Sequence, residues 1–117
     1  MEINSIVTKG IGLGEQIGFP TLNLNPKDAP DEFGTGVYNC EVEFEDVIYK
    51  GVMHYGPKSI GTDNPNKTFF EIHVLNFNKS INNEKVKVKV LKKIRDVREF
   101  KSAYELIDQI NKDISNA

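Results

Sequence analysis

The sequence predicts a mainly β fold, with six antiparallel strands followed by one C-terminal helix. Apolar and polar residues alternate with a period of two over most of the chain, which is typical of half-buried strands. Only the end of the chain, from about residue 102, changes to a helical period. The length of 117 residues, 38% of them hydrophobic and 27% charged, predicts a single domain over residues 1–117 with one modest core.

The first strands are expected at residues 3–9 and 20–24, joined by a glycine-rich loop. The segment 37–44 has one apolar and one polar face. Its apolar face comprises Tyr38, Cys40, Val42 and Phe44, and its polar face comprises Asn39, Glu41 and Glu43. A tight turn at Glu45 and Asp46 would let residues 47–55 pair back as a hairpin.

Two further strands follow. Residues 68–77 are apolar on both faces, which predicts a central strand. Residues 85–94 alternate lysine with valine, which predicts a strand with one solvated face. The segments 25–36 and 56–67 are rich in proline and glycine and are predicted loops. A short six-stranded sheet must hide its edges, and closure into a barrel does so.

The last element is predicted to be an amphipathic helix over about residues 102–115. Ser102 and Glu105 have the spacing of a capping box. The apolar positions recur at helical spacing and comprise Ala103, Leu106, Ile107, Ile110 and Ile114. This helix would cover one opening or one side of the barrel.

Charge and cysteine content exclude several classes of protein. A net charge of −2 disfavours a general binder of nucleic acid or of membrane surfaces, although a local basic pocket for an anionic ligand stays open. The single cysteine, Cys40, cannot form an internal disulfide and lies in a strand-like run, which predicts a core position and a reducing, cytoplasmic setting. No signal peptide and no membrane-spanning run is recognisable.

The glycine-rich loop is the first candidate site. Gly10, Gly12 and Gly14 alternate, which allows positive φ angles and exposes backbone N–H groups to an anion. Glu15 breaks the GxGxxG spacing, and no Walker motif follows. An ordinary loop between two strands explains the same residues.

Three side chains on the strands are further candidates. Thr21 and Asn23 are two apart and share a strand face, so both could reach one ion or one phosphate; a merely polar strand face is the alternative. Glu71 lies in the most apolar strand, where burial would raise its pKa and make it a proton acceptor. A salt bridge across the sheet would also satisfy Glu71. His73 shares its face.

Metal and basic clusters give weaker signals. Two histidines and one cysteine have no metal-ligand spacing, so a structural zinc site is rejected. Arg95 and Arg98 lie just before the helix. They could bind a ligand, or they could only solvate the end of the helix.

Taken in order, these segments resemble the riboflavin kinase (flavokinase) family over about residues 5 to 115. The matching motifs are GFPTLN at 18–23, GVY at 36–38, YKGVMHYG at 49–56, FEIHVLNF at 70–77, IRDVREFKS at 94–102 and QINKDI at 109–114. The resemblance implies a six-stranded antiparallel Greek-key barrel with a C-terminal helix. Many bacterial relatives add an N-terminal FMN adenylyltransferase domain, which is absent here, so a stand-alone kinase domain that does not make FAD is expected.

The resemblance also implies a reaction. Family members transfer the γ-phosphoryl group of ATP to the ribityl 5′-hydroxyl of riboflavin, giving FMN, with Mg²⁺. The threonine and asparagine that hold the metal and the phosphates fall on Thr21 and Asn23, and the catalytic base falls on Glu71. The remaining implied contacts lie around the nucleotide and the flavin. They comprise Gly12, Gly14, Val74 and Asn76 for the nucleotide, and Arg95, Arg98 and Phe100 for the flavin.

The sequence departs from the family pattern around the nucleotide. Leu13 and Glu15 stand where basic residues are usual in the glycine loop. Lys58-Ser59-Ile60, Asn82-Asn83 and Val97 depart as well. These departures keep a second hypothesis open, a non-catalytic flavin-binding or regulatory module on the same fold. In either case a cytoplasmic monomer is expected that binds small molecules and neither nucleic acid nor membrane.

Overall fold

The protein is a six-stranded antiparallel sheet with one helix packed against its outer side. The computed structural model describes residues 1–8, 21–31, 33–57, 67–75, 83–98 and 100–115. The elements in chain order are β1 (Glu2–Val7), β2 (Thr21–Leu24), the short 3-10 helix η1 (Pro26–Asp28), β3 (Gly36–Phe44), β4 (Val47–Gly56), β5 (Phe69–Val74), β6 (Glu84–Arg95) and α2 (Ala103–Ser115). The six predicted strands and the predicted helix are all present, which confirms the mainly β class.

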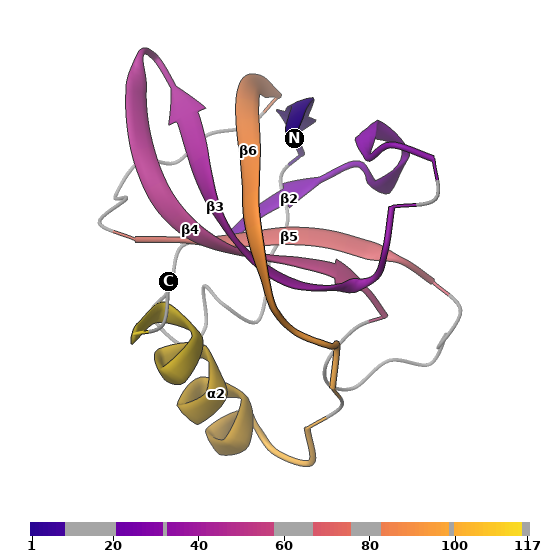
Figure 1. Ribbon diagram of the computed structural model, residues 1–117, viewed down its shortest axis with the longest axis vertical. Coiled ribbons are helices and arrows are strands. Elements are labelled where there is room, and N and C mark those ends of the chain that lie inside the picture. Colours follow the sequence, from indigo (N-terminus) through magenta and orange to yellow (C-terminus); the bar gives the residue numbers. More distant parts are fainter. Residues whose placement is uncertain (9–20, 32, 58–66, 76–82, 99, 116–117) are drawn as a thin grey trace.

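The sheet curls into a half-barrel. The strand order is β1-β6-β3-β4-β5-β2, so β6 returns to lie beside β3, which is the Greek-key arrangement. In Figure 1, β3 and β4 change direction along their length, and α2 lies outside the sheet at one end. The edge strands meet where the Thr8 N–H donates to the Asn23 carbonyl at 2.8 Å. The predicted six-stranded Greek-key fold is therefore confirmed as a curled half-barrel, and within the described residues this bridge joins its edges.

The inside of the barrel is the hydrophobic core. Alternate residues of every strand point inward, as the period of two predicts. The buried core residues are Ile3, Val7, Leu22, Leu24, Ala29, Cys40, Val42, Phe44, Met53, Phe70, Ile72, Val74, Val86, Val88 and Val90. Burial, with a smaller effect of the Glu41 charge, raises the pKa of Cys40 to about 12, so this thiol stays protonated and inert.

The outer face of β1, β6, β3 and β4 carries opposite charges at facing positions. Glu2 lies opposite Lys89, Lys89 opposite Glu41, and Glu41 opposite Lys50. Opposite charges on facing positions of neighbouring strands contribute roughly 0.2–1 kcal/mol per pair. The lysines of β6 are therefore interleaved with carboxylates on this face.

Tight turns and bulges shape the strand ends. Glu45 (φ 49°) and Asp46 (φ 63°) adopt left-handed backbone angles, which confirms the predicted tight turn between β3 and β4. The register of β6 against β3 shifts at two places. At one of them the side-chain oxygen of Asn39 accepts the Lys92 N–H at 2.6 Å, which replaces a missing ladder bond. These shifts bring Arg95 opposite Val37.

The predicted loop 25–36 contains one short helix that the sequence did not predict. Pro26 fixes φ at the first helical position, and the Asn25 side chain accepts the Lys27 N–H at 3.0 Å. Asp28 at the end of η1 accepts a 2.6 Å hydrogen bond from the Ser5 hydroxyl. This bond holds η1 against the edge strand β1.

Helix α2 begins with a capping arrangement close to the predicted one. The Ser102 hydroxyl accepts the Glu105 N–H at 3.3 Å, while the Glu105 carboxylate accepts the Lys101 N–H at 3.1 Å. Ile110 and Asp113 are its buried side chains among those described. No helix of the described residues is long and apolar enough to cross a membrane.

Gly51 controls the spacing between β4 and β5, and its replacement tests the packing. A Cβ atom there would lie 2.9 Å from Ile72 Cγ2 and 3.1 Å from the His73 carbonyl oxygen. We expect Gly51→Ala to lower the free energy of unfolding by about 1–3 kcal/mol in urea denaturation, because the carbonyl moves only with its strand. In the control Gly34→Ala the nearest atom is the Tyr38 hydroxyl at 3.5 Å, and the change should stay within about 0.5 kcal/mol. Equal effects of the two variants would contradict this account of the packing.

Candidate functional site

The pairing of β2 with β5 brings three predicted site residues together. In this pair Thr21 faces His73 and Asn23 faces Glu71. Facing residues of antiparallel strands have Cβ atoms about 4.5–5.5 Å apart. The alternate residues of both strands are buried in the core, so these four side chains lie on the outer face of the barrel. Thr21, Asn23 and Glu71 therefore form one cluster, although the two motifs are far apart in the sequence.

The cluster continues across the sheet as a row of facing positions. His54 of β4 faces Glu71, and Val37 of β3 faces His54. Arg95 of β6 faces Val37 in turn. One row thus runs from Asn23 on β2 to Arg95 on β6 over the outer face of five strands.

His73 contacts the candidate ligand Thr21. His73 Nδ1 lies 3.3 Å from Thr21 Oγ1, which is hydrogen-bond distance. Burial, and then the nearby His54, lower the pKa of His73 from 6.5 to about 4, while Asp113 acts in the opposite direction. The imidazole is therefore neutral at pH 7, with one nitrogen able to accept a hydroxyl proton.

His54 is also a buried neutral histidine. Its side chain is 9% exposed, and its Nε2 lies 2.7 Å from the Pro57 carbonyl oxygen. Because a carbonyl only accepts, the proton of the neutral ring is on Nε2. Burial lowers the pKa of His54 most, and the positive charge of Arg95 lowers it further, against the hydrogen bonds to the Pro57 and Gly56 backbone. Both histidines of the chain thus lie uncharged on the outer face of the sheet.

Asn23 carries an unsatisfied polar atom that points to a ligand. Its Nδ2 is buried and has no hydrogen-bond partner among the described residues. Such an atom costs about 1–3 kcal/mol, and native proteins leave few of them. A half-turn of the amide would present its oxygen instead. An amide oxygen beside a hydroxyl is a donor set that fits a hard cation such as Mg²⁺.

Carboxylate, thiolate and imidazole groups do not form a separate metal centre in the described part of the chain. There, no three His, Cys, Asp or Glu side chains gather closely enough to hold a metal ion. Among the described residues, a cation at the β2–β5 face would therefore have fewer than three such ligands and would need neutral protein oxygens, a substrate or water to complete its coordination.

The arginine segment after β6 is tied to α2. Arg95 Nη2 lies 2.9 Å from Asp113 Oδ2, and Arg95 Nε also donates to this carboxylate. Arg98 donates to the Gln109 side-chain oxygen at 2.8 Å. Both guanidinium groups lie near the Phe100 ring, at 5.7 Å for Arg95 and 4.8 Å for Arg98. Phe100 is only 5% exposed, so its buried ring forms a fixed surface against which both guanidinium groups lie.

The other predicted site residues are placed differently. Val74 is in the core, so only its backbone could meet a ligand on the outer face. Gly12, Gly14 and Asn76 lie outside the described residues, as do Leu13 and Glu15. Their predicted roles stay predictions.

Sequence reasoning missed three residues of this face: His54, Gln109 and Asp113. The signal for Asp113 was present, because it follows Ile110 by three positions and so shares the apolar stripe of the helix. A charged residue at such a position predicts a buried partner. His54 and Gln109 are recognised only once the register of β4 and the position of α2 are known.

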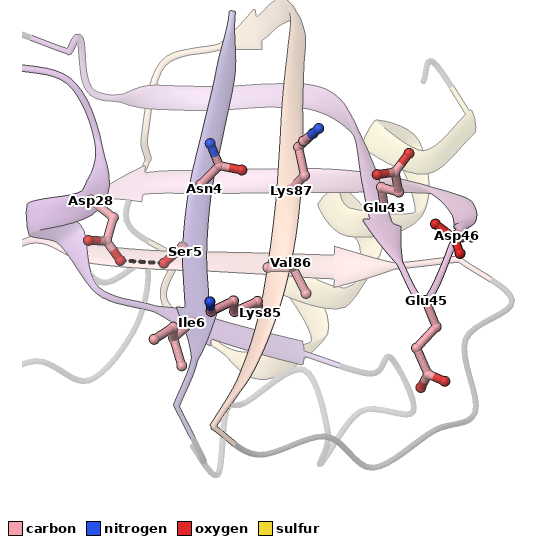
Figure 2. Close-up of a pocket in the computed structure, with 10 residues that line it drawn as sticks. All are labelled: Asn4, Ser5, Ile6, Asp28, Glu43, Glu45, Asp46, Lys85, Val86 and Lys87. Atoms are coloured by element: carbon pink, nitrogen blue, oxygen red, sulfur yellow. Dashed lines mark hydrogen bonds between the residues drawn. The ribbon is translucent and has the colours of Figure 1, made fainter.

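A separate cavity of about 610 Å³ lies between β1, β6, η1 and the tip of the β3–β4 hairpin. Figure 2 shows that none of the predicted site residues lines it. Its charged lining comprises Asp28, Glu43, Glu45, Asp46, Lys85 and Lys87. Four carboxylates against two ammonium groups disfavour a nucleotide phosphate there.

Comparison with known proteins identifies the relatives of this chain. The family model described as "Flavokinase: Riboflavin kinase" matches residues 1–117. The RNA-binding riboflavin kinase RibR of Bacillus subtilis is 38% identical over 113 residues, which are 97% of this chain and 48% of that protein. The bifunctional riboflavin kinase/FMN adenylyltransferase of the same organism is 33% identical over 116 residues, 98% of this chain and 37% of that protein.

A solved structure has the same fold. It is described as a macrolide-efflux protein from Streptococcus pneumoniae and superposes with a TM-score of 0.83 at 32% identity, covering 97% of this chain and 37% of that one. This chain thus spans less than half the length of each of these three proteins.

The two neutral histidines predict a pH-dependent stability. A histidine in the unfolded chain has a pKa of about 6.5, above the lowered folded values. The unfolded chain therefore takes up protons first, so this stability is present above about pH 7 and is lost as pH falls toward 4. We expect the free energy of unfolding, measured by urea denaturation, to fall by roughly 2 kcal/mol from pH 7 to pH 5.

The matching variant is His54→Gln, whose amide can still donate to the Pro57 carbonyl. It should make the decrease between pH 7 and pH 5 smaller, because one of the two titrating groups is gone. An unchanged slope in this variant would show that His54 does not contribute to the pH dependence.

Proposed function

This chain belongs to the riboflavin kinase family, and we propose that it transfers the γ-phosphoryl group of ATP to the ribityl 5′-hydroxyl of riboflavin, giving FMN. The observation that carries the proposal is the pairing of Asn23 with Glu71 and of Thr21 with His73 on one outer face. It sets a carboxylate directly beside two neutral oxygen ligands, the combination that phosphoryl transfer to a hydroxyl uses. The activity would reside in one domain, residues 1–117, acting as a monomer.

Glu71 is the proposed general base. It is half-buried on β5, between Asn23 on one neighbouring strand and His54 on the other. Its carboxylate accepts the proton of the ribityl hydroxyl as the hydroxyl oxygen bonds to the γ-phosphorus of ATP. The bond from that phosphorus to the bridging oxygen breaks, and ADP leaves with the electron pair.

Thr21 and Asn23 are the proposed holders of Mg²⁺ and of the nucleotide phosphates. Bound Mg²⁺ would neutralise negative charge on the phosphates. His73 at 3.3 Å from Thr21 Oγ1 restricts the rotation of that hydroxyl. The Asn23 Nδ2, which is buried without a partner among the described residues, would gain one when a ligand arrives, so binding would relieve this cost.

The nucleotide and the flavin would occupy opposite sides of this cluster. We assign Gly12, Gly14 and Asn76, together with the Val74 backbone, to the nucleotide. We assign the arginine segment to the flavin. Arg98 suits this role, because among the described residues Gln109 is its one hydrogen-bond acceptor and most of its N–H donors stay available. The carbonyl oxygens of the flavin ring system are suitable acceptors.

We propose small-molecule substrates and no nucleic-acid partner for this domain. The relative RibR is an RNA-binding riboflavin kinase. In this chain, however, two of the five lysines of β6 face glutamates: Lys89 faces Glu2 and Glu41, and Lys87 faces Glu43. Such interleaving lowers the positive potential that nucleic-acid binding requires. The ATP supply of the cytoplasm suits the proposed reaction.

The base assignment predicts a specific loss of turnover. With riboflavin, ATP and Mg²⁺, the wild-type chain should form FMN, and Glu71→Gln should lower kcat by about 10² or more, because the amide accepts no proton. FMN is measured by chromatography with fluorescence detection. Glu43 lines the separate cavity, so Glu43→Gln is the control and should have the turnover of the wild-type chain.

The outcomes separate the two hypotheses. Turnover by Glu71→Gln equal to wild type would remove Glu71 from the mechanism. Quenching of riboflavin fluorescence by the wild-type chain without FMN formation, across a panel of nucleotides, would favour the non-catalytic flavin-binding module.

Asn23→Val tests the proposed ligand role of the amide. The substitution removes a buried N–H group that has no partner within the described part of the chain, so the stability of the ligand-free protein should stay equal or increase. The rise in melting temperature caused by MgADP should be largely lost in this variant, as measured by differential scanning fluorimetry. A full MgADP-induced rise would contradict the assignment of Asn23.

A further inference from the structure

Asp113 stands where helix geometry and burial both disfavour a carboxylate. It lies near the C-terminal end of α2, where the helix dipole repels negative charge, and its side chain is only 1% exposed. Burying an ion pair adds little net stability, because desolvation offsets the attraction. We therefore look for the role of Asp113 in the side chains that it orients rather than in net stability.

Asp113 accepts hydrogen bonds from two of the three guanidinium nitrogens of Arg95. Oδ1 accepts Arg95 Nε at 3.1 Å, and Oδ2 accepts Arg95 Nη2 at 2.9 Å, which is the forked pairing of a guanidinium with a carboxylate. Arg95 Nη1 donates to the Asp96 carbonyl at 3.1 Å. All three guanidinium nitrogens of Arg95 thus donate hydrogen bonds to acceptors within the protein.

Asp113 also reaches Arg98, through Gln109. The Gln109 Nε2 donates to Asp113 Oδ1 at 2.9 Å, and Gln109 Oε1 accepts Arg98 Nη2 at 2.8 Å. The amide is therefore fixed at both ends, and its orientation follows from Asp113. Arg98 lies over the Phe100 ring, and because Gln109 is its one hydrogen-bond acceptor among the residues that the structure describes, its other N–H donors are left for a ligand.

We propose that Asp113 and Gln109 are positioning residues for flavin binding: through the relay Asp113–Gln109–Arg98 they hold the Arg98 guanidinium toward the carbonyl edge of the isoalloxazine ring. The inference rests on the proposed function and extends it, because it assigns different roles to Arg95 and Arg98. Arg98 is the ligand-binding cation, whereas Arg95 joins β6 to α2. A preset guanidinium loses less side-chain entropy on binding, so the relay raises flavin affinity without touching the flavin.

The test compares two aspartates of the same helix. Asp113→Asn removes the charge that orders the relay, while Asp108→Asn removes a carboxylate whose partner is the exposed Lys112 at 3.1 Å. Riboflavin dissociation constants come from fluorescence quenching, and MgADP dissociation constants from calorimetry. Asp113→Asn should weaken riboflavin binding about tenfold and leave MgADP binding within about twofold, while Asp108→Asn should change neither by more than about twofold.

Gln109→Met is the second variant, because it breaks the relay and leaves the Arg95–Asp113 pair in place. It should weaken riboflavin binding about fivefold with a melting temperature close to wild type. In active protein, both relay variants should raise KM for riboflavin more than they lower kcat. Riboflavin affinity equal to wild type in Gln109→Met, or equal losses of riboflavin and MgADP affinity in Asp113→Asn, would overturn the proposal.

The outcomes for the relay and for the kinase differ. If the wild-type chain binds riboflavin without forming FMN, the kinase proposal fails, and a selective loss in Gln109→Met still supports the relay. If the wild-type chain forms FMN and Gln109→Met binds riboflavin normally, only the relay fails. A wild-type chain that binds no riboflavin overturns both.

Discussion

The register between β2 and β5 is the constraint on which the candidate site depends. The inward residues Leu22 and Ile72 face each other in the core, and this packing fixes which neighbours point outward. A slip of one residue would turn Thr21 and Asn23 into the barrel and expose the leucines. The hydrophobic core therefore does more than stabilise the fold, since it sets Asn23 opposite Glu71. At Gly51 the absence of a side chain lets β4 approach β5, because a Cβ atom there would lie 2.9 Å from Ile72 Cγ2 and 3.1 Å from the His73 carbonyl oxygen.

A second layer, between the sheet and α2, is held by polar groups. His54 and His73 are neutral there, and Arg95 forms an ion pair with Asp113. Protonation of His54 would add positive charge near Arg95 in a poorly solvated region. The same layer joins the end of β6 to α2, and it thereby connects the arginine segment with the outer face that carries Glu71.

Local patterns predicted the strands well, because alternation depends only on neighbouring residues. The hairpin at Glu45 and Asp46 and the cap at Ser102 are local in the same sense. The cluster of Thr21, Asn23 and Glu71 needed a family resemblance, since nothing local says that β2 pairs with β5. The roles of His54 and Gln109 escaped prediction because they arise from register and helix docking. Asp113 was missed as well, although a charged residue on the apolar stripe of a helix is a local signal; its partner is recognised only from the bulged course of β6.

The central claim is that Asn23 and Glu71 act as one unit across the β2–β5 pair. A double-mutant cycle on kcat/KM for FMN formation tests it most directly, with Asn23→Val, Glu71→Gln and the combined variant. Residues that act together in one transition state show strongly non-additive losses. The structure predicts that the double variant is little worse than Glu71→Gln alone. Losses that multiply, so that the double variant shows the product of the two single effects, would contradict the claim.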